Sequence, residues 1–118
     1  MSKINIRVTL RNDNQNIVQD TVGTYSKNIL CYEEENGMKV SFDYKNNTLH
    51  RANDEFGMKI DFNTEYIRTS FLGYIHELFI KVISLKKDKK NVYIEYEIDN
   101  QGETERYLYR IEERKWVY

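Results

Sequence analysis

The sequence predicts an all-β protein, an antiparallel up-and-down barrel of about eight to ten strands. Three observations predict this fold class. Apolar and polar side chains alternate along most of the chain, short polar turns separate the alternating runs, and none of the 118 residues is proline. Alternation with a period of two is typical of strands that bury one face. Connections too short to hold a helix favour antiparallel neighbours, and without proline every strand residue can donate its backbone hydrogen bond.

The composition is typical of a single globular domain spanning residues 1–118. The net charge is −1, and without a basic excess we expect no nucleic-acid partner. No apolar run approaches the ~20 residues of a membrane span, so we expect no membrane contact. The first residues alternate instead of forming a signal core, which predicts a cytoplasmic protein. Because Cys31 is the single cysteine, neither an intrachain disulfide nor a paired-cysteine metal site is expected.

The first half of the chain contains six alternating runs. The predicted strands are 3–11, 17–26, 28–34, 38–45, 48–52 and 58–63. Asn36-Gly37 lies between two of these runs and predicts a type I′ hairpin turn, whose two central residues both need positive φ. The pairs that this turn implies are Cys31–Phe42 and Ile29–Tyr44 on the inner face and Glu34–Lys39 on the outer face. Gly23 within the second run predicts a bulge or a bend, as closure of a small barrel requires.

Residues 66–86 fit two structures. Residues 75, 78, 79, 82 and 83 are apolar at helical spacing, whereas the run 78–83 also fits a strand that is buried on both faces. Periodicity alone does not separate these alternatives. Several of the residues are β-branched, which costs side-chain freedom in a helix and suits a strand. We therefore predict strands at 66–71 and 75–85 with a bend at Gly73, and an amphipathic helix over 75–85 is the alternative.

The last hairpin, residues 91–111, has the clearest pattern. A two-residue loop at Gln101-Gly102 brings apolar residues opposite apolar ones and acidic residues opposite basic ones. The predicted pairs are Tyr96–Tyr107, Ile94–Tyr109 and Val92–Ile111 on the apolar face, and Glu97–Arg106 and Tyr93–Arg110 on the polar face. A three-residue loop would place Arg106 opposite Tyr96, inside. Because a one-residue slip turns every side chain to the other face, the pattern favours the two-residue loop.

Several short markers follow one another in a recognisable order. They are Gly23-Thr24-Tyr25, Leu30-Cys31-Tyr32-Glu33, Met58-Lys59-Ile60-Asp61-Phe62, Tyr66, Thr69 and Gly73. Their order resembles that of the signatures of the YwiB-like family, a group of small bacterial proteins with a lipocalin-like (calycin) β-barrel. The resemblance covers residues 4–112 and departs from the family pattern at Phe56-Gly57. It implies a lipocalin-like barrel in a bacterial protein, and it implies no established activity or catalytic residue.

The sequence contains no convincing catalytic or metal-binding constellation. A two-residue turn at Asn46-Asn47 would pair His50 with Asp43, an arrangement that can serve acid–base chemistry, although a solvated cross-strand pair is the more common meaning. Cys31 is expected to fill the core as a small apolar residue. The basic cluster 86–90 could touch phosphates, but a solvated turn is the preferred interpretation. We therefore predict no enzyme activity, no cofactor and no metal.

The aromatic residues carry the binding hypothesis, since the chain has ten tyrosines and five phenylalanines. The residues predicted to line the barrel interior are Tyr44, Tyr96, Tyr107, Tyr109 and Phe42. Aromatic walls with a few polar groups are typical of small-molecule sites. The first hypothesis is therefore a non-enzymatic binder of a small, partly apolar ligand. In the second, the rings fill the barrel to normal density, and the protein is an interaction or structural module that meets a protein partner or forms a homodimer.

Overall fold

The computed structural model describes residues 2–115, apart from the side chain of residue 100, and this part consists of strands and turns without a helix. The ten strands are β1 (Ser2–Arg11), β2 (Asn16–Ser26), β3 (Ile29–Glu33), β4 (Lys39–Asp43), β5 (Thr48–Ala52), β6 (Phe56–Asp61), β7 (Tyr66–Phe71), β8 (Tyr74–Asp88), β9 (Asn91–Asn100) and β10 (Glu103–Glu113). Their hydrogen-bonded order, β1-β10-β9-β8-β7-β6-β5-β4-β3-β2, closes into a barrel. The predicted all-β, antiparallel, up-and-down barrel is confirmed.

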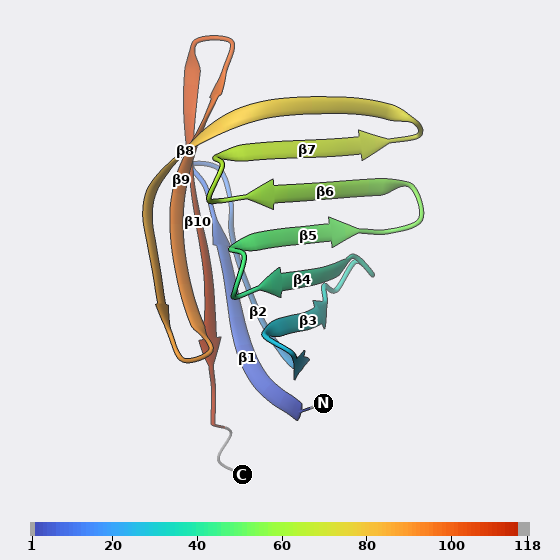
Figure 1. Cartoon of the computed structure of the whole chain (residues 1–118), viewed down its shortest axis with the longest axis vertical. Helices are drawn as coiled ribbons and strands as arrows, with labels where there is room; N and C mark the ends of the chain where they lie inside the picture. Colours follow the sequence, from blue (N-terminus) through green and yellow to red (C-terminus); the bar gives the residue numbers. More distant parts are fainter. Residues whose placement is uncertain (1, 116–118) are drawn as a thin grey trace. The chain divides into compact units, whose positions relative to one another are not determined.

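The chain divides into two compact units, and β1, β2 and β8 contribute to both. Among the described residues, the first unit consists of 2–3 and Gly23–Phe79, and the second consists of Ile4–Val22 and 80–115. Figure 1 shows β4, β5, β6 and β7 of the first unit as neighbouring antiparallel arrows. Short turns between these strands give the meander that the polar segments of the sequence predict.

The core of the first unit contains a straight row of apolar residues. Each member lies directly opposite the next on the neighbouring strand, and the row runs through Leu30, Phe42, Leu49, Ile60 and Ile67. None of these five side chains is more than 4% exposed. Alternation along each strand therefore places one apolar residue per strand at the same level of the sheet.

The second unit has its own buried face on β9 and β10. Tyr96 lies opposite Tyr107, Ile94 opposite Tyr109 and Val92 opposite Ile111, and the outer face pairs Glu97 with Arg106 and Tyr93 with Arg110. Gln101 and Gly102 both have positive φ, 54° and 85°, as a two-residue type I′ loop requires. The register predicted for the last hairpin is confirmed.

The predicted register of the β3–β4 hairpin is wrong by one residue. Leu30, and not Cys31, lies opposite Phe42, and Lys39 lies opposite Glu33. The loop has three residues: Glu34 N donates to Met38 O at 2.8 Å, and Gly37 alone takes positive φ. A turn followed by a left-handed glycine closes such a hairpin. The slip turns Cys31 outward, where it is an exposed free thiol instead of a core residue.

Two further predictions need correction. His50 lies opposite Ser41, not Asp43, because the β4–β5 connection is longer than two residues. The Asp43 carboxylate instead accepts hydrogen bonds from the backbone amides of Lys45 and Asn46, at 2.9 and 3.0 Å, and orders this turn. These bonds to the ionised form lower the pKa of Asp43. The second correction concerns β8, which is a strand as predicted but does not bury both faces.

Candidate interaction surface

The aromatic residues that were predicted to hold a ligand are packed within their own units. In the first unit the rings of Phe42 and Tyr44 meet edge to face, with centroids 5.1 Å apart, and Tyr25 meets Tyr44 in the same way at 5.7 Å. Phe42 is fully buried and Tyr44 is 9% exposed. These rings act as packing partners of one another in the first unit.

In the second unit Tyr96 and Tyr107 stack with a centroid separation of 5.3 Å and an interplanar angle of 11°. Tyr96 and Tyr109 are buried, whereas Tyr107 is half-buried and its hydroxyl donates to the Glu105 carboxylate. Burial, followed by this hydrogen bond, raises the pKa of Tyr107 to about 12. Tyr107 also lines an open pocket of about 290 Å³ whose walls carry both acidic and basic side chains.

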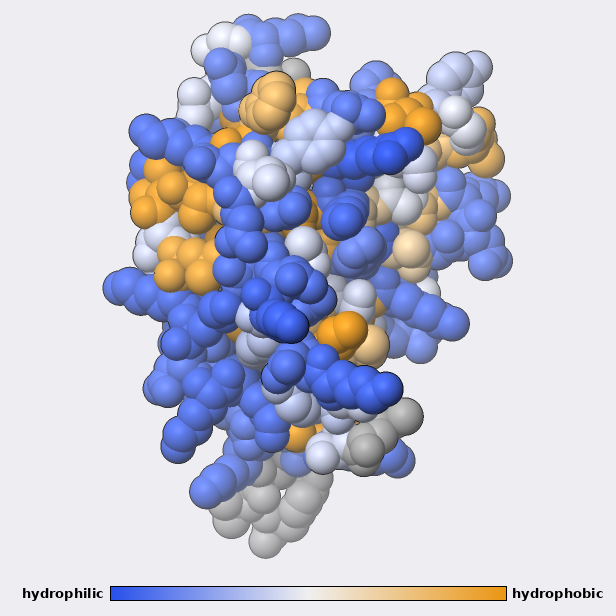
Figure 2. All heavy atoms as spheres, in the orientation of Figure 1, coloured by the Kyte–Doolittle hydropathy of each residue, from blue (hydrophilic) through white to orange (hydrophobic). Residues whose placement is uncertain are grey.

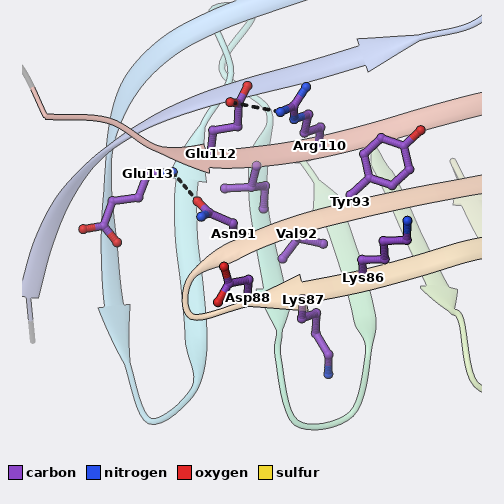
Figure 3. A pocket seen from close by; sticks show the side chains of 10 residues that line it. Lys86, Lys87, Asp88, Asn91, Val92, Tyr93, Arg110, Glu112 and Glu113 are labelled. Atoms are coloured by element: carbon purple, nitrogen blue, oxygen red, sulfur yellow. Dashed lines mark hydrogen bonds and ion pairs between the residues drawn. The ribbon is translucent and has the colours of Figure 1, made fainter.

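A second open pocket, of about 310 Å³, lies where β8 turns into β9 (Figure 3). Its charged lining residues are Lys86, Lys87, Arg110, Asp88, Glu112 and Glu113. Three cations and three anions give this lining no net formal charge that would favour an anion. Arg110 is moreover paired with Glu112 at 3.2 Å, and Asn91 accepts from the backbone of Glu113 at 2.8 Å. The pocket does not favour the phosphate contact considered for residues 86–90.

No metal site emerges from the part of the chain that the structure describes. Within residues 2–115, no three His, Cys, Asp or Glu side chains gather in a way that could hold a metal ion. His76 and Glu77 are neighbours on β8 and therefore point to opposite faces. No helix with the length and apolarity to cross a membrane occurs among the described residues.

The large exposed apolar side chains gather on the β7–β8 hairpin. Of the eleven such side chains among the described residues, six lie on this hairpin, with exposed fractions from 42% to 78%: Phe71, Leu72, Tyr74, Ile75, Leu78 and Phe79. We call this set the hairpin surface. Figure 2 shows apolar side chains at the upper right, where Figure 1 places the β7–β8 turn, and a second group at the left of the same face. Soluble proteins rarely gather so many exposed apolar side chains on one hairpin without a binding role.

The tip of the hairpin has the loop geometry of Gln101-Gly102, but with an apolar residue in the first position. Leu72 and Gly73 form a two-residue loop in which both residues take positive φ, 49° and 84°. Glycine adopts this conformation without cost, whereas an apolar residue such as leucine is strained there. Leu72 is also 63% exposed, so the fold gains no core packing in return for the strain. The loop therefore presents an apolar side chain to solvent at the tip of the hairpin.

The outer face of the hairpin fixes an acidic group between two apolar ones. Glu77 lies opposite Arg68 on β7 and accepts a hydrogen bond from the Tyr66 hydroxyl. Ile75 and Phe79 flank it along β8, and the Phe79 ring lies 5.8 Å from the ring of Tyr66. The outer row along β8 is therefore apolar, acidic and apolar.

The first part of β8 is also a sheet edge. Its residues Tyr74–Phe79 pair with β7 on one side. On the other side, the pairs with β9 begin only at Ile80, which lies opposite Ile98, and no described residue pairs with β8 before that point. All six residues from Tyr74 to Phe79 are exposed. Unpaired backbone groups along an apolar edge are a template for another strand.

No family model, curated protein or solved structure matches this chain. The resemblance to the YwiB-like family therefore stays a prediction. The function is inferred from the geometry of the described residues alone.

The sequence does not predict the hairpin surface, because the apolar run 78–83 fits a strand that is buried on both faces. In the structure Ile80 is 6% exposed and its neighbour Phe79 is 78% exposed. The sequence pattern of an apolar strand is the same whether or not a neighbouring element covers its side chains. The positive signal in the sequence was Leu72-Gly73 preceded and followed by aromatic residues, which places apolar side chains at a turn.

Proposed function

We propose that this chain is a protein-interaction module that binds a partner through the hairpin surface. The observation that carries this proposal is an edge strand whose six residues, Tyr74–Phe79, are all exposed and mostly apolar. Covering them would remove from water several side chains that each contribute roughly 1.5–3 kcal/mol on full burial. The aromatic and aliphatic composition matches that of residues that dominate protein interfaces.

A small apolar ligand in the barrel interior is the second proposal. It is supported by the aromatic content and by the resemblance to a lipocalin-like family. The close packing of Phe42 with Tyr44 and of Tyr96 with Tyr107 counts against it, because rings in contact with one another leave little room for a guest within either unit.

Selection of peptides from a displayed random library distinguishes the two proposals. Wild-type protein is the target, and enriched peptides are then tested on the double variant Tyr74→Ser/Phe79→Ser. We expect binding to be lost, because these two side chains are 75% and 78% exposed and form the ends of the edge strand. The matched control is Ile17→Ser/Val18→Ser, which removes exposed apolar side chains from β2.

Enriched peptides that bind both double variants as well as the wild type would place the interaction elsewhere. If no peptide is enriched and the protein instead takes up an apolar fluorescent probe, with uptake reduced in Tyr96→Phe, the interior-ligand proposal replaces the interaction module.

A further inference from the structure

The backbone of β8 determines which groups face the open edge. The two-residue loop Leu72–Gly73 is closed by the pair Phe71–Tyr74, which is a hydrogen-bonded pair in hairpins of this kind. Hydrogen-bonded and non-hydrogen-bonded pairs alternate along an antiparallel ladder. Residues 74, 76 and 78 therefore direct their backbone groups to β7. The N–H and C=O groups of Ile75, Glu77 and Phe79 point to the open edge.

The apolar row of the first unit ends at this edge. Leu78 lies opposite Ile67 and is the sixth member of the row that begins at Leu30. Every other member is at most 4% exposed, whereas Leu78 is 42% exposed. One further strand with an apolar side chain at this level would complete the row and cover Leu78.

We propose that the partner adds an antiparallel strand to the Tyr74–Phe79 edge of β8, with a lysine or arginine opposite Glu77. This inference rests on the proposed interaction function and identifies the kind of partner. Apolar side chains of the added strand meet Phe79, Leu78 and Ile75, and a polar side chain meets His76. Backbone hydrogen bonds supply affinity, and the apolar–apolar–basic–polar–apolar pattern supplies specificity, as in other strand-addition complexes.

Charge complementarity favours a basic segment over a second copy of this chain. Two copies can pair antiparallel so that the edge backbone groups of residues 75, 77 and 79 in both copies form hydrogen bonds. This pairing is centred on Glu77, and it places the two Glu77 carboxylates directly opposite each other. Like charges in that position destabilise a sheet. Self-pairing centred on His76 or on Leu78 instead sets Ile75 or Phe79 against Glu77, which satisfies neither side chain.

The test uses the synthetic peptide Ac-Thr-Val-Leu-Lys-Thr-Val-Thr-NH2, whose central lysine is designed to lie opposite Glu77. Two versions carry one backbone N-methyl group each, either on the lysine amide, which faces β8, or on the following threonine amide, which faces away. Binding of labelled peptide is followed by fluorescence anisotropy. We expect methylation of lysine to weaken binding by at least about tenfold and methylation of threonine to change it less than about threefold.

Charge reversal tests the role of Glu77 separately. The Glu77→Lys variant should reject the lysine peptide and bind the peptide that carries glutamate instead, with Glu77→Gln intermediate for both. Glu77 is exposed, but Glu77→Lys places a second cation opposite Arg68, so the thermal midpoint of each variant is measured to check that it is folded. If Glu77→Lys binds the glutamate peptide as tightly as the wild type binds the lysine peptide, the charged residue of the peptide lies opposite position 77.

Three outcomes would overturn strand addition. Equal affinity of the two methylated peptides, combined with loss of binding in Tyr74→Ser/Phe79→Ser, would show that the hairpin surface binds by side chains alone, and the interaction proposal would stand. No binding of the parent peptide at 1 mM, roughly the weakest affinity of interest, would reject the basic strand as partner. A dimer of wild-type protein that the double variant abolishes would make a second copy the occupant.

Discussion

Leu78 lies directly opposite Ile67 on the neighbouring strand, yet Ile67 is 4% exposed and Leu78 is 42% exposed. Two apolar residues in the same cross-strand pair thus have different surroundings, because β8 is the last strand of the first unit at this level and β7 is not. The difference separates residues that maintain the fold from residues available for binding.

The pair gives a direct stability test. Ile67→Ala should destabilise the protein by about 2–5 kcal/mol, because it leaves a cavity in a packed row. Leu78→Ala should cost about 1 kcal/mol or less, since a partly exposed side chain loses fewer contacts. Urea denaturation of both variants measures the free energies of unfolding. Similar losses for the two would show that Leu78 is covered as well as Ile67.

The turn glycine of the β3–β4 hairpin makes a second test. Gly37 has a φ of +85°, and no atom lies within 4 Å of the position that a Cβ would take. A substitution therefore acts through the backbone and not through a clash. Gly37→Val should destabilise by about 1–3 kcal/mol, and Gly37→Asn by less, because asparagine tolerates this conformation. An unchanged denaturation midpoint for valine would contradict the left-handed turn.

The corrected register of β3 is tested by thiol chemistry. Cys31 faces outward opposite Ser41 and is exposed. We therefore expect one equivalent of thiol to react with an aromatic disulfide reagent in the native protein, without denaturant, as an accessible cysteine does. Cys31→Ser is the control and should give no reaction. A thiol that reacts only after unfolding would support the inward orientation predicted from the sequence.

These outcomes show which features the sequence predicts and which it does not. The β9–β10 register could be predicted because one face of each strand is mostly apolar and the other mostly charged, so a slip would place charged side chains such as Arg106 inside. On β3 both faces carry apolar residues, Ile29 and Cys31 on one and Leu30 and Tyr32 on the other. Two registers were therefore compatible with the alternation there, and the loop length around Gly37 decided between them.

The candidate surface could not be predicted for a related reason. The order of strands determines what covers β8, and the pairing of β8 with β9 starts only at Ile80. Alternation reports that a side chain is apolar, but it does not report where the neighbouring strand ends. The segment Tyr74–Phe79 therefore has the sequence of a buried strand and the surroundings of an edge.

Tyr107 provides a prediction for alkaline pH. Its pKa is raised to about 12 by burial and by the hydrogen bond to Glu105, from an ordinary value of about 10. The folded state therefore holds the phenol proton more tightly than the unfolded state. The stabilisation from this group is complete below about pH 10 and is lost as the pH rises toward about 12.

Urea denaturation between pH 9 and pH 11.5, values chosen to lie around the ordinary tyrosine pKa of about 10, measures this effect. The wild type should lose stability more steeply than Tyr107→Phe, because the variant lacks the group that titrates. All other groups are common to the two proteins and cancel in the comparison. Parallel stability curves would show that the Tyr107 hydroxyl titrates as an exposed tyrosine does.

Two adjacent residues of β8 test the boundary between the core and the hairpin surface. Ile80 is 6% exposed and Phe79 is 78% exposed. Ile80→Asp should prevent folding or reduce stability by more than about 3 kcal/mol, because it buries an unpaired charge. Phe79→Asp should leave the thermal midpoint nearly unchanged and should weaken binding of the lysine peptide, since it removes an apolar contact of the added strand. Loss of soluble protein in both variants would mean that Phe79 is covered, and the hairpin surface would then not be available to a partner.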